Sequence, residues 1–382
     1  MKDFDHIRPF NNDEIAGVKE RLLQNDEFIS AIARYRIGRI EKWIPFLVHP
    51  IVRSALKSRF RNIDKVEDIP HIVKKYIDQT IRQTTSGFTV SGIKELDPYK
   101  SYLFISNHRD IALDAAFLNY ALLTNGHRTA RIAIGDNLLS KPFVGDLIRL
   151  NKSFIVKRSV TRPREMLSNF KVLSAYIRHT LQIDKFPVWI AQSEGRAKDG
   201  WDKTQPAVIK MITMAKQKEE RFEDYIRKLR IVPVAISYEL DPNDAVKAKE
   251  VYVLDKYGKY RKGKYEDVDS ISRGITGKKG RVHLAFGQPI NASLRSAEEV
   301  ALAIDEQIID FYKIFPSNII AYRSLFYQDP HIELNTGSIT GRMKKLFKKR
   351  IKDMPKKHRI FALRIYANPI IQKENLDKPT QA

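Results

Sequence analysis

From Phe88 onward, the chain alternates short β-prone runs with helical segments, and this alternation limits the possible folds more than any other feature. The runs are apolar and rich in β-branched and aromatic residues, whereas the segments between them carry apolar residues at helical spacing. The predicted strands are Phe88–Val90, Tyr102–Ile105, Arg131–Ile134, Phe154–Val156, Val188–Ala191, Val232–Ile236 and Val282–Phe286. The pattern predicts an α/β fold with a mixed, largely parallel sheet flanked by helices.

Helical sequence is expected on both sides of this region. Residues 13–83 place Ile15, Val18, Leu22 and Leu23 at helical spacing and contain few glycines. Further helices are expected near 114–123, 163–181 and 205–215 and from Ala297 onward, and the charged stretch 256–264 is expected to be a surface loop. We therefore predict three domains: an N-terminal helical region (1–86), an α/β domain (87–295) and a C-terminal helical basic region (296–382).

The formal net charge of +23 indicates an anionic partner. Nucleic acid, an anionic membrane surface and acidic carriers such as coenzyme A and acyl carrier protein all satisfy this requirement. The chain has no helix-turn-helix, zinc-finger or aromatic RNA-binding signature, so nucleic acid is not the expected partner. A basic nucleic-acid-binding protein stays the alternative from another functional class. The absence of cysteine excludes disulfides and thiolate–zinc sites.

The densely basic segment 342–364 places five apolar residues on one helical face: Met343, Leu346, Phe347, Ile351 and Met354. A helix of this kind either lies on an anionic membrane surface or packs its apolar stripe on its own domain. No apolar run approaches the ~20 residues needed to span a bilayer. Since Met1–His6 is polar, with no apolar stretch behind it, the expected location is cytoplasmic, peripheral at the inner membrane face.

The block Asn107–Asp114 contains the residues most suited to catalysis. His108 follows a predicted strand, and a nearby aspartate can hold one ring nitrogen so that the other accepts a proton. Asp114 also has a structural interpretation, because it precedes an apolar helical segment that it could cap.

Three further blocks follow in order. Residues 151–158 form a β-prone run that ends in Arg158, where a phosphate could be bound. An apolar run then leads into Glu194, Gly195 and Arg196, a turn in which backbone N–H groups and cations could receive an anion. Residues 231–239 read as a buried strand with a proline near its start. Taken singly, each of these blocks also suits a purely structural role.

Together and in this order, the four blocks resemble the glycerolipid acyltransferase family, the glycerol-3-phosphate and 1-acylglycerol-3-phosphate acyltransferases. The resemblance covers about residues 100 to 240 and rests on a His–Asp motif, a Phe-Ile-x-x-Arg strand, a Glu-Gly block and a Val-Pro strand. The family usually has four residues between His and Asp, whereas five separate His108 from Asp114. Asp114 is the expected partner of His108, and Asp110 is the alternative. Gln192-Ser193 replaces the family's frequent Phe-Pro.

The resemblance implies transfer of an acyl group from acyl-CoA or acyl carrier protein to a glycerol-phosphate hydroxyl, in phospholipid biosynthesis. His108 would act as base, Asp114 would orient it, and Arg158, Glu194, Gly195 and Arg196 would bind the acceptor. No metal or prosthetic group is implied. The expected acceptor is 1-acyl-sn-glycerol-3-phosphate, with glycerol-3-phosphate or another lysolipid as alternatives.

Two other functions compete with transfer. A hydrolase could use Ser106 or Ser193 as its nucleophile, although the chain has no Gly-x-Ser-x-Gly elbow. The longer His–Asp spacing is also compatible with a protein that has an acyltransferase-like fold but has lost its activity.

Overall fold

The computed structural model describes residues 4–37, 45–139, 141–160, 162–263, 265–291, 293–332 and 339–376. The chain divides into two compact units. The first comprises residues 1–76 and 130–176, and the second comprises residues 77–129 and 177–382. The three domain limits predicted from the sequence stay a prediction.

The first unit is mainly helical around one small core. Its elements are α1 (Ile15–Gln24), α2 (Asp26–Ile37), α3 (Pro45–Phe60), the start of α4 (Asp68–Thr84), β3 (Arg131–Gly135), α6 (Pro142–Leu150), β4 (Ser153–Val156) and most of α7 (Pro163–Gln182). Ile15, Val18 and Leu22 are buried, as their helical spacing predicts. β3 and β4 pair in parallel, with Ala133 opposite Phe154.

The second unit contains five strands in the order β1-β7-β6-β2-β5. Their bounds are β1 (Thr85–Ser91), β2 (Leu103–Ser106), β5 (Val188–Ala191), β6 (Ile231–Tyr238) and β7 (Gly280–Phe286). β2 pairs in parallel with β5 and β6, β1 pairs in parallel with β7, and only the β6–β7 pairing of these is antiparallel. All residues of β2 and β6 are buried, as expected for strands covered on both faces. The predicted α/β fold with a mixed, largely parallel sheet is confirmed.

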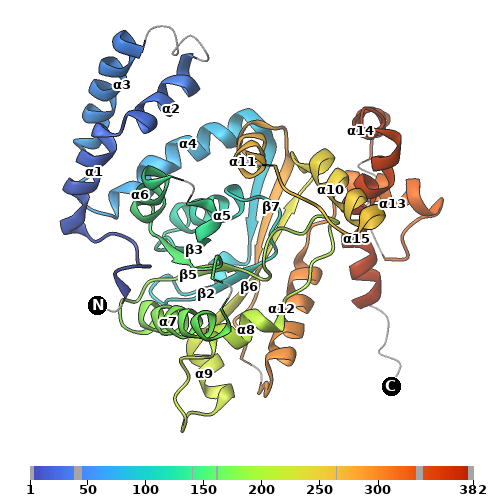
Figure 1. Ribbon diagram of the computed structural model, residues 1–382. Helices are drawn as coiled ribbons and strands as arrows, with labels where there is room; N and C mark the ends of the chain where they lie inside the picture. Colours follow the sequence, from blue (N-terminus) through green and yellow to red (C-terminus); the bar gives the residue numbers. More distant parts are fainter. Residues whose placement is uncertain are drawn as a thin grey trace. The chain divides into compact units, whose positions relative to one another are not determined.

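Helices lie on both faces of these five strands. The helices that belong wholly to this unit are α5 (Leu113–Thr124), α8 (Pro206–Ile212), α9 (Phe222–Leu229), α10 (Asp244–Tyr257), α11 (Glu266–Thr276), α12 (Ala297–Phe311), α13 (Pro316–Phe326), α14 (Gly341–Lys352) and α15 (Arg359–Leu376). In Figure 1, α5 and α11 lie on one side of the strands, and α8 and α12 lie on the other. None of the helices in the described part of the chain combines the length and apolarity that crossing a membrane requires.

Local sequence explains several helix ends. The side chain of Ser296 accepts a hydrogen bond from the backbone N–H of Glu299 and so caps α12. The Thr340 side chain caps α14 in the same way. α10 is followed by Gly258, whose φ of +69° suits glycine.

The predicted surface loop over 256–264 is wrong at its start, because residues 256 and 257 belong to α10. Residue 264 lies outside the described residues. α6, α9, α10 and α11 were not predicted.

The basic segment 342–364 does not form one continuous helix. α14 ends at Lys352, and α15 begins at Arg359 after a short 3-10 turn. Phe347, Ile351 and Met354 are buried in a cluster with residues of α10, α13 and α15. The apolar stripe thus packs on its own unit, and of its two interpretations the structural one is right. Leu346 differs, since 58% of it is exposed.

Gly200 is required where the chain passes close to α15. Its φ is +82°, and a Cβ at this position would lie 2.1 Å from the carbonyl oxygen of Ile365. We expect Gly200→Ala to destabilise the protein by at least about 2 kcal/mol, measured by urea unfolding, because backbone strain adds to the clash. Gly126→Ala is the matched control. Its φ is +79° with no neighbour within 4 Å, so only the strain, about 1 kcal/mol, is expected. Equal losses for both variants would contradict the clash.

Candidate active site

The site lies at one edge of the second unit's sheet. Because β2 pairs in parallel with β5 on one side and β6 on the other, the carboxyl ends of the three strands meet at the same edge, where α/β proteins commonly bind ligands. Ser106 is paired with Ala191 and with Val234, so β2 and β5 end level while β6 continues to Tyr238. The first, third and fourth sequence blocks are thereby brought together.

His108 and Asp114 form a direct pair. His108 Nδ1 lies 2.8 Å from Asp114 Oδ2, and the side-chain exposures are 15% and 0%. The imidazole also packs edge-on against Trp189, with the ring centroids 5.9 Å apart. Since the carboxylate accepts a hydrogen bond from Nδ1–H, Nε2 is the ring nitrogen that can receive a proton. This arrangement suits a general base held in one tautomer.

Asp110, the alternative partner, does not contact the imidazole. Its Oδ1 accepts hydrogen bonds from the backbone N–H groups of Ala112 (3.0 Å) and Leu113 (2.9 Å), at the start of α5. The capping role considered for Asp114 is thus performed by Asp110. Burial, and then the neighbouring charge of Asp114, raise the pKa of Asp110.

A buried network that the sequence did not predict holds the histidine loop. Arg109 Nη2 pairs with Asp202 Oδ2 at 2.6 Å, with both side chains at most 5% exposed. Burial opposes the charge of Arg109, but Asp202 raises the pKa of the guanidinium above its ordinary value. Lys247 Nζ donates to the carbonyl oxygen of Arg109 (2.7 Å) and pairs with Asp241. Because these residues lie up to 138 positions apart, local sequence carries no signal for them.

The Glu-Gly block lies next to the histidine loop. The backbone N–H of Ala197 donates to the carbonyl oxygen of His108 at 2.9 Å. Glu194 and Gly195 are exposed and Arg196 is half-buried. Gly195 has a φ of +78° and no neighbour within 4 Å of a Cβ built there, so its backbone is open to a close approach.

Not every cation of this block is available to an anion. Lys198 pairs with Glu250 of α10, and burial lowers the pKa of the lysine.

Arg158 lies in the first unit, exposed just beyond the end of β4. Its backbone N–H donates to Asp136 Oδ1 at 3.0 Å, and the same carboxylate accepts from the hydroxyl of Ser159. The predicted strand ending in this arginine is present. Its part in binding an acceptor phosphate stays a prediction.

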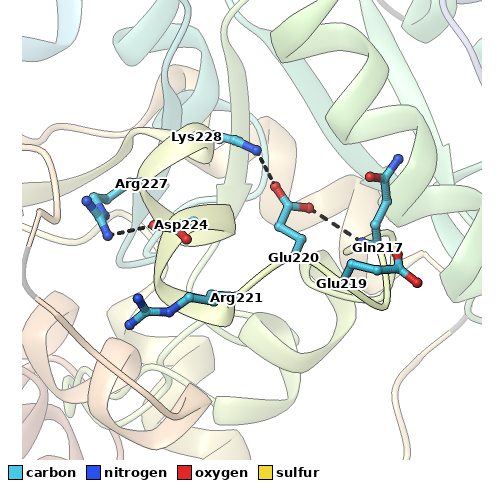
Figure 2. Close-up of a pocket in the computed structure, with 7 residues that line it drawn as sticks. All are labelled: Gln217, Glu219, Glu220, Arg221, Asp224, Arg227 and Lys228. Carbon is cyan, nitrogen blue, oxygen red and sulfur yellow. Dashed lines mark hydrogen bonds and ion pairs between the residues drawn. The ribbon is translucent and has the colours of Figure 1, made fainter.

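A surface depression of about 590 Å³ lies between α8 and α9 and contains none of the predicted site residues. Figure 2 shows two ion pairs among its charged side chains: Lys228 with Glu220, and Arg227 with Asp224. This charged lining does not suit an acyl chain. Among the described residues, no three His, Cys, Asp or Glu side chains are grouped so that they could hold a metal ion.

Comparison with known proteins agrees with this geometry. The acyltransferase family model matches residues 87–237, a segment that contains the His–Asp pair and the Glu-Gly block. Among solved structures, the chain is similar to the 1-acyl-sn-glycerophosphate (LPA) acyltransferase PlsC from Thermotoga maritima. The match has 15% identity and a TM-score of 0.37 and covers 74% of this chain and 92% of that one. No curated protein matches significantly. The similarity to the acyltransferase family thus covers the segment that holds the His108–Asp114 pair.

Proposed function

We propose that the protein transfers a fatty acyl group from acyl-CoA or acyl carrier protein to a hydroxyl of a glycerol-phosphate acceptor, in phospholipid biosynthesis. The expected acceptor is 1-acyl-sn-glycerol-3-phosphate. The observation that carries the proposal is the His108–Asp114 pair at the carboxyl edge of the sheet, within the acyltransferase segment. The four blocks that resemble glycerolipid acyltransferases support the acceptor class.

In the proposed reaction, His108 Nε2 takes the proton of the acceptor hydroxyl as its oxygen attacks the thioester carbonyl carbon. Asp114 stabilises the imidazolium that forms. The tetrahedral intermediate then collapses, the C–S bond breaks, and the leaving thiolate receives the proton from Nε2. The acceptor itself is the nucleophile, so the reaction needs neither an acyl-enzyme nor a metal or prosthetic group.

We assign the acceptor phosphate to Arg196 and the open backbone at Gly195. A charge-assisted hydrogen bond to this arginine would contribute about 1.5–3 kcal/mol. For Arg158, a role in binding the phosphate is expected from the sequence resemblance alone. Glu194 would anchor the loop or contact acceptor hydroxyls. The backbone N–H at this position donates to Gln205 Oε1 at 3.3 Å and so holds the loop independently of the glutamate side chain.

The test is acyl transfer by the purified chain from labelled acyl-CoA and from labelled acyl carrier protein. The acceptors are glycerol-3-phosphate, 1-acyl-sn-glycerol-3-phosphate and other lysophospholipids. Transfer to the lysophosphatidate is expected, and preference for glycerol-3-phosphate or another lysolipid would change the acceptor but not the reaction. A folded protein that transfers nothing from either donor would contradict the proposal and favour a binding function.

The proposed acceptor resides in a membrane, and α3 offers an apolar surface for reaching it. Phe46, Leu47 and Ile51 are 71%, 55% and 68% exposed. Lys57 and Arg59 on the same helix are exposed cations that suit an anionic surface. Since Phe347 and Ile351 of α14 are buried, α3 is the better candidate for insertion, and the net charge of +23 would add attraction. The proposed location is the cytoplasmic face of the membrane.

Serine at all three positions of α3 (Phe46→Ser, Leu47→Ser, Ile51→Ser) is expected to weaken binding to phosphatidylglycerol-containing vesicles at least tenfold. Three exposed apolar side chains lose their burial in the interface. Vesicle co-sedimentation at low and high salt measures this, and the remaining binding should be released by salt. The control is Leu302→Ser, which alters an exposed leucine of α12. Unchanged, salt-resistant binding of the triple variant would exclude α3.

A further inference from the structure

The Asp114 carboxylate is held by more groups than the imidazole. Its Oδ2 accepts hydrogen bonds from His108 Nδ1 (2.8 Å) and from the backbone N–H groups of Arg109 (2.5 Å) and Asp110 (2.9 Å). Its Oδ1 accepts a hydrogen bond from the hydroxyl of Tyr238 at 2.8 Å. The backbone donors and the imidazole therefore act on one oxygen, and the tyrosine acts on the other.

Tyr238 is firmly placed to make this contact. It is the last residue of β6, paired with Val282 of β7, and only 5% exposed. Its ring packs against Phe117 of α5 at 6.2 Å between centroids, so the tyrosine also contacts the helix that carries Asp114. Burial, together with the charge of Asp114, raises the pKa of Tyr238 well above its ordinary value, so the hydroxyl keeps its proton. Tyr238 lies one residue beyond the segment that matches the family model.

We propose that Tyr238 is a positioning residue for the base: its hydroxyl fixes Asp114 so that Oδ2 faces His108 Nδ1. The inference rests on the proposed function of His108 as the proton acceptor. The hydroxyl does two things. It prevents rotation of the carboxylate, which keeps the proton on Nδ1, and it draws electron density from the carboxylate.

Other charged groups lie near His108, Asp114 and Tyr238 and contribute to the electrostatic potential at these residues. Asp110 is next to Asp114, and Asp241 acts on both Asp110 and Tyr238. Lys279 interacts electrostatically with Asp110. Lys247 donates a hydrogen bond to the carbonyl oxygen of Arg109, and the guanidinium of Arg109 forms an ion pair with Asp202. Tyr238→Phe leaves all of these in place, so a change in titration can be attributed to the lost hydroxyl.

Tyr238→Phe is expected to lower kcat about tenfold with KM values within twofold. In a plot of kcat/KM against pH, the acid limb, where activity falls as the pH is lowered, should move to higher pH. Without the hydroxyl, the carboxylate holds more negative charge, so the imidazolium is stabilised and His108 gives up its proton at higher pH. Added to Asp114→Asn, the same change should cost less than twofold, because the tyrosine acts through the aspartate. An acid limb that stays in place or moves to lower pH overturns the inference.

Tyr120→Phe is the matched control. Tyr120 lies on the same helix as Asp114, and its hydroxyl donates to Asp78 Oδ1 at 2.7 Å. This change also removes a Tyr–Asp hydrogen bond, but Asp78 is not the aspartate that pairs with His108. The dependence of kcat/KM on pH should therefore stay as in the wild type. If Tyr238→Phe does not fold, 3-fluorotyrosine at position 238 replaces it. A more acidic phenol donates more strongly, and the acid limb should then move to lower pH.

A second readout separates this inference from the proposed function. The ¹⁵N imidazole signals of the full chain, with His108 assigned from the spectrum of His108→Ala, report its tautomer and its titration directly. A higher His108 pKa in Tyr238→Phe supports the positioning role even if no acyl transfer is detected. Identical His108 tautomer and titration in wild type and variant overturn it, whatever the activity.

Discussion

Alanine in place of His108 is expected to lower acyl transfer about a thousandfold or more. An acceptor hydroxyl has a pKa far above neutral, so attack on the thioester depends on a base that removes its proton in the transition state, and such bases commonly contribute 10²–10⁴-fold. The loss should fall on kcat, because the imidazole is not assigned to substrate binding. Initial rates at saturating acceptor and donor measure the effect.

The protein supplies a close control for this substitution. His179 Nε2 lies 3.2 Å from Asp184 Oδ1, a second His–Asp pair in the same unit but outside the site. His179→Ala should leave transfer within about twofold. If both variants keep full activity, the base is another group. If both lose activity alike, the loss reflects stability rather than chemistry, and circular dichroism with urea unfolding would then show it.

The second large effect is expected at Asp114, and comparison with Asp110 makes it specific. Asp114→Asn should lower transfer by about 10³–10⁴-fold, since an amide cannot stabilise the imidazolium as a carboxylate does. Asp110→Asn should keep transfer within about fivefold. The asparagine oxygen can still accept hydrogen bonds from the N–H groups of Ala112 and Leu113 that Asp110 accepts now.

The two asparagine variants are measured in the same transfer assay as wild type, with pH profiles for whichever retains activity. We expect the two variants to differ because Asp114 Oδ2 lies 2.8 Å from His108 Nδ1, whereas Asp110 accepts hydrogen bonds from the start of α5. Loss of transfer on Asp110→Asn with activity kept in Asp114→Asn would assign the pair to Asp110 and would contradict this geometry.

Much of the fold was predictable because its signals are local. All seven predicted strands are present, since short apolar runs bounded by turns differ in periodicity from the helices between them. The antiparallel orientation of β7 against β6 was not predicted. It depends on a pairing between segments more than forty residues apart, and no local pattern records strand direction.

The candidate site was predictable only in part. His108, Asp114 and the Glu-Gly turn were found as residue types at strand ends, and the structure brings them together. Arg158 was found in the same way but lies in the other unit. Tyr238 was passed over because a tyrosine ending an apolar strand looks like part of the core. The positioning role that we propose for it depends on a hydrogen bond to a residue 124 positions away.

By itself, the sequence determined the α/β alternation and the order of the four blocks that resemble glycerolipid acyltransferases, because periodicity and motif order are properties of neighbouring residues. Only the tertiary structure decided which carboxylate holds the imidazole, that Arg109 and Asp202 anchor the loop, and that the apolar face of α14 is buried. Each of these depends on which distant groups meet in a buried space. In a buried space, a charge without a partner costs folding free energy. The side-chain arrangement is therefore determined by which hydrogen-bond partners meet there, and not by spacing along the chain.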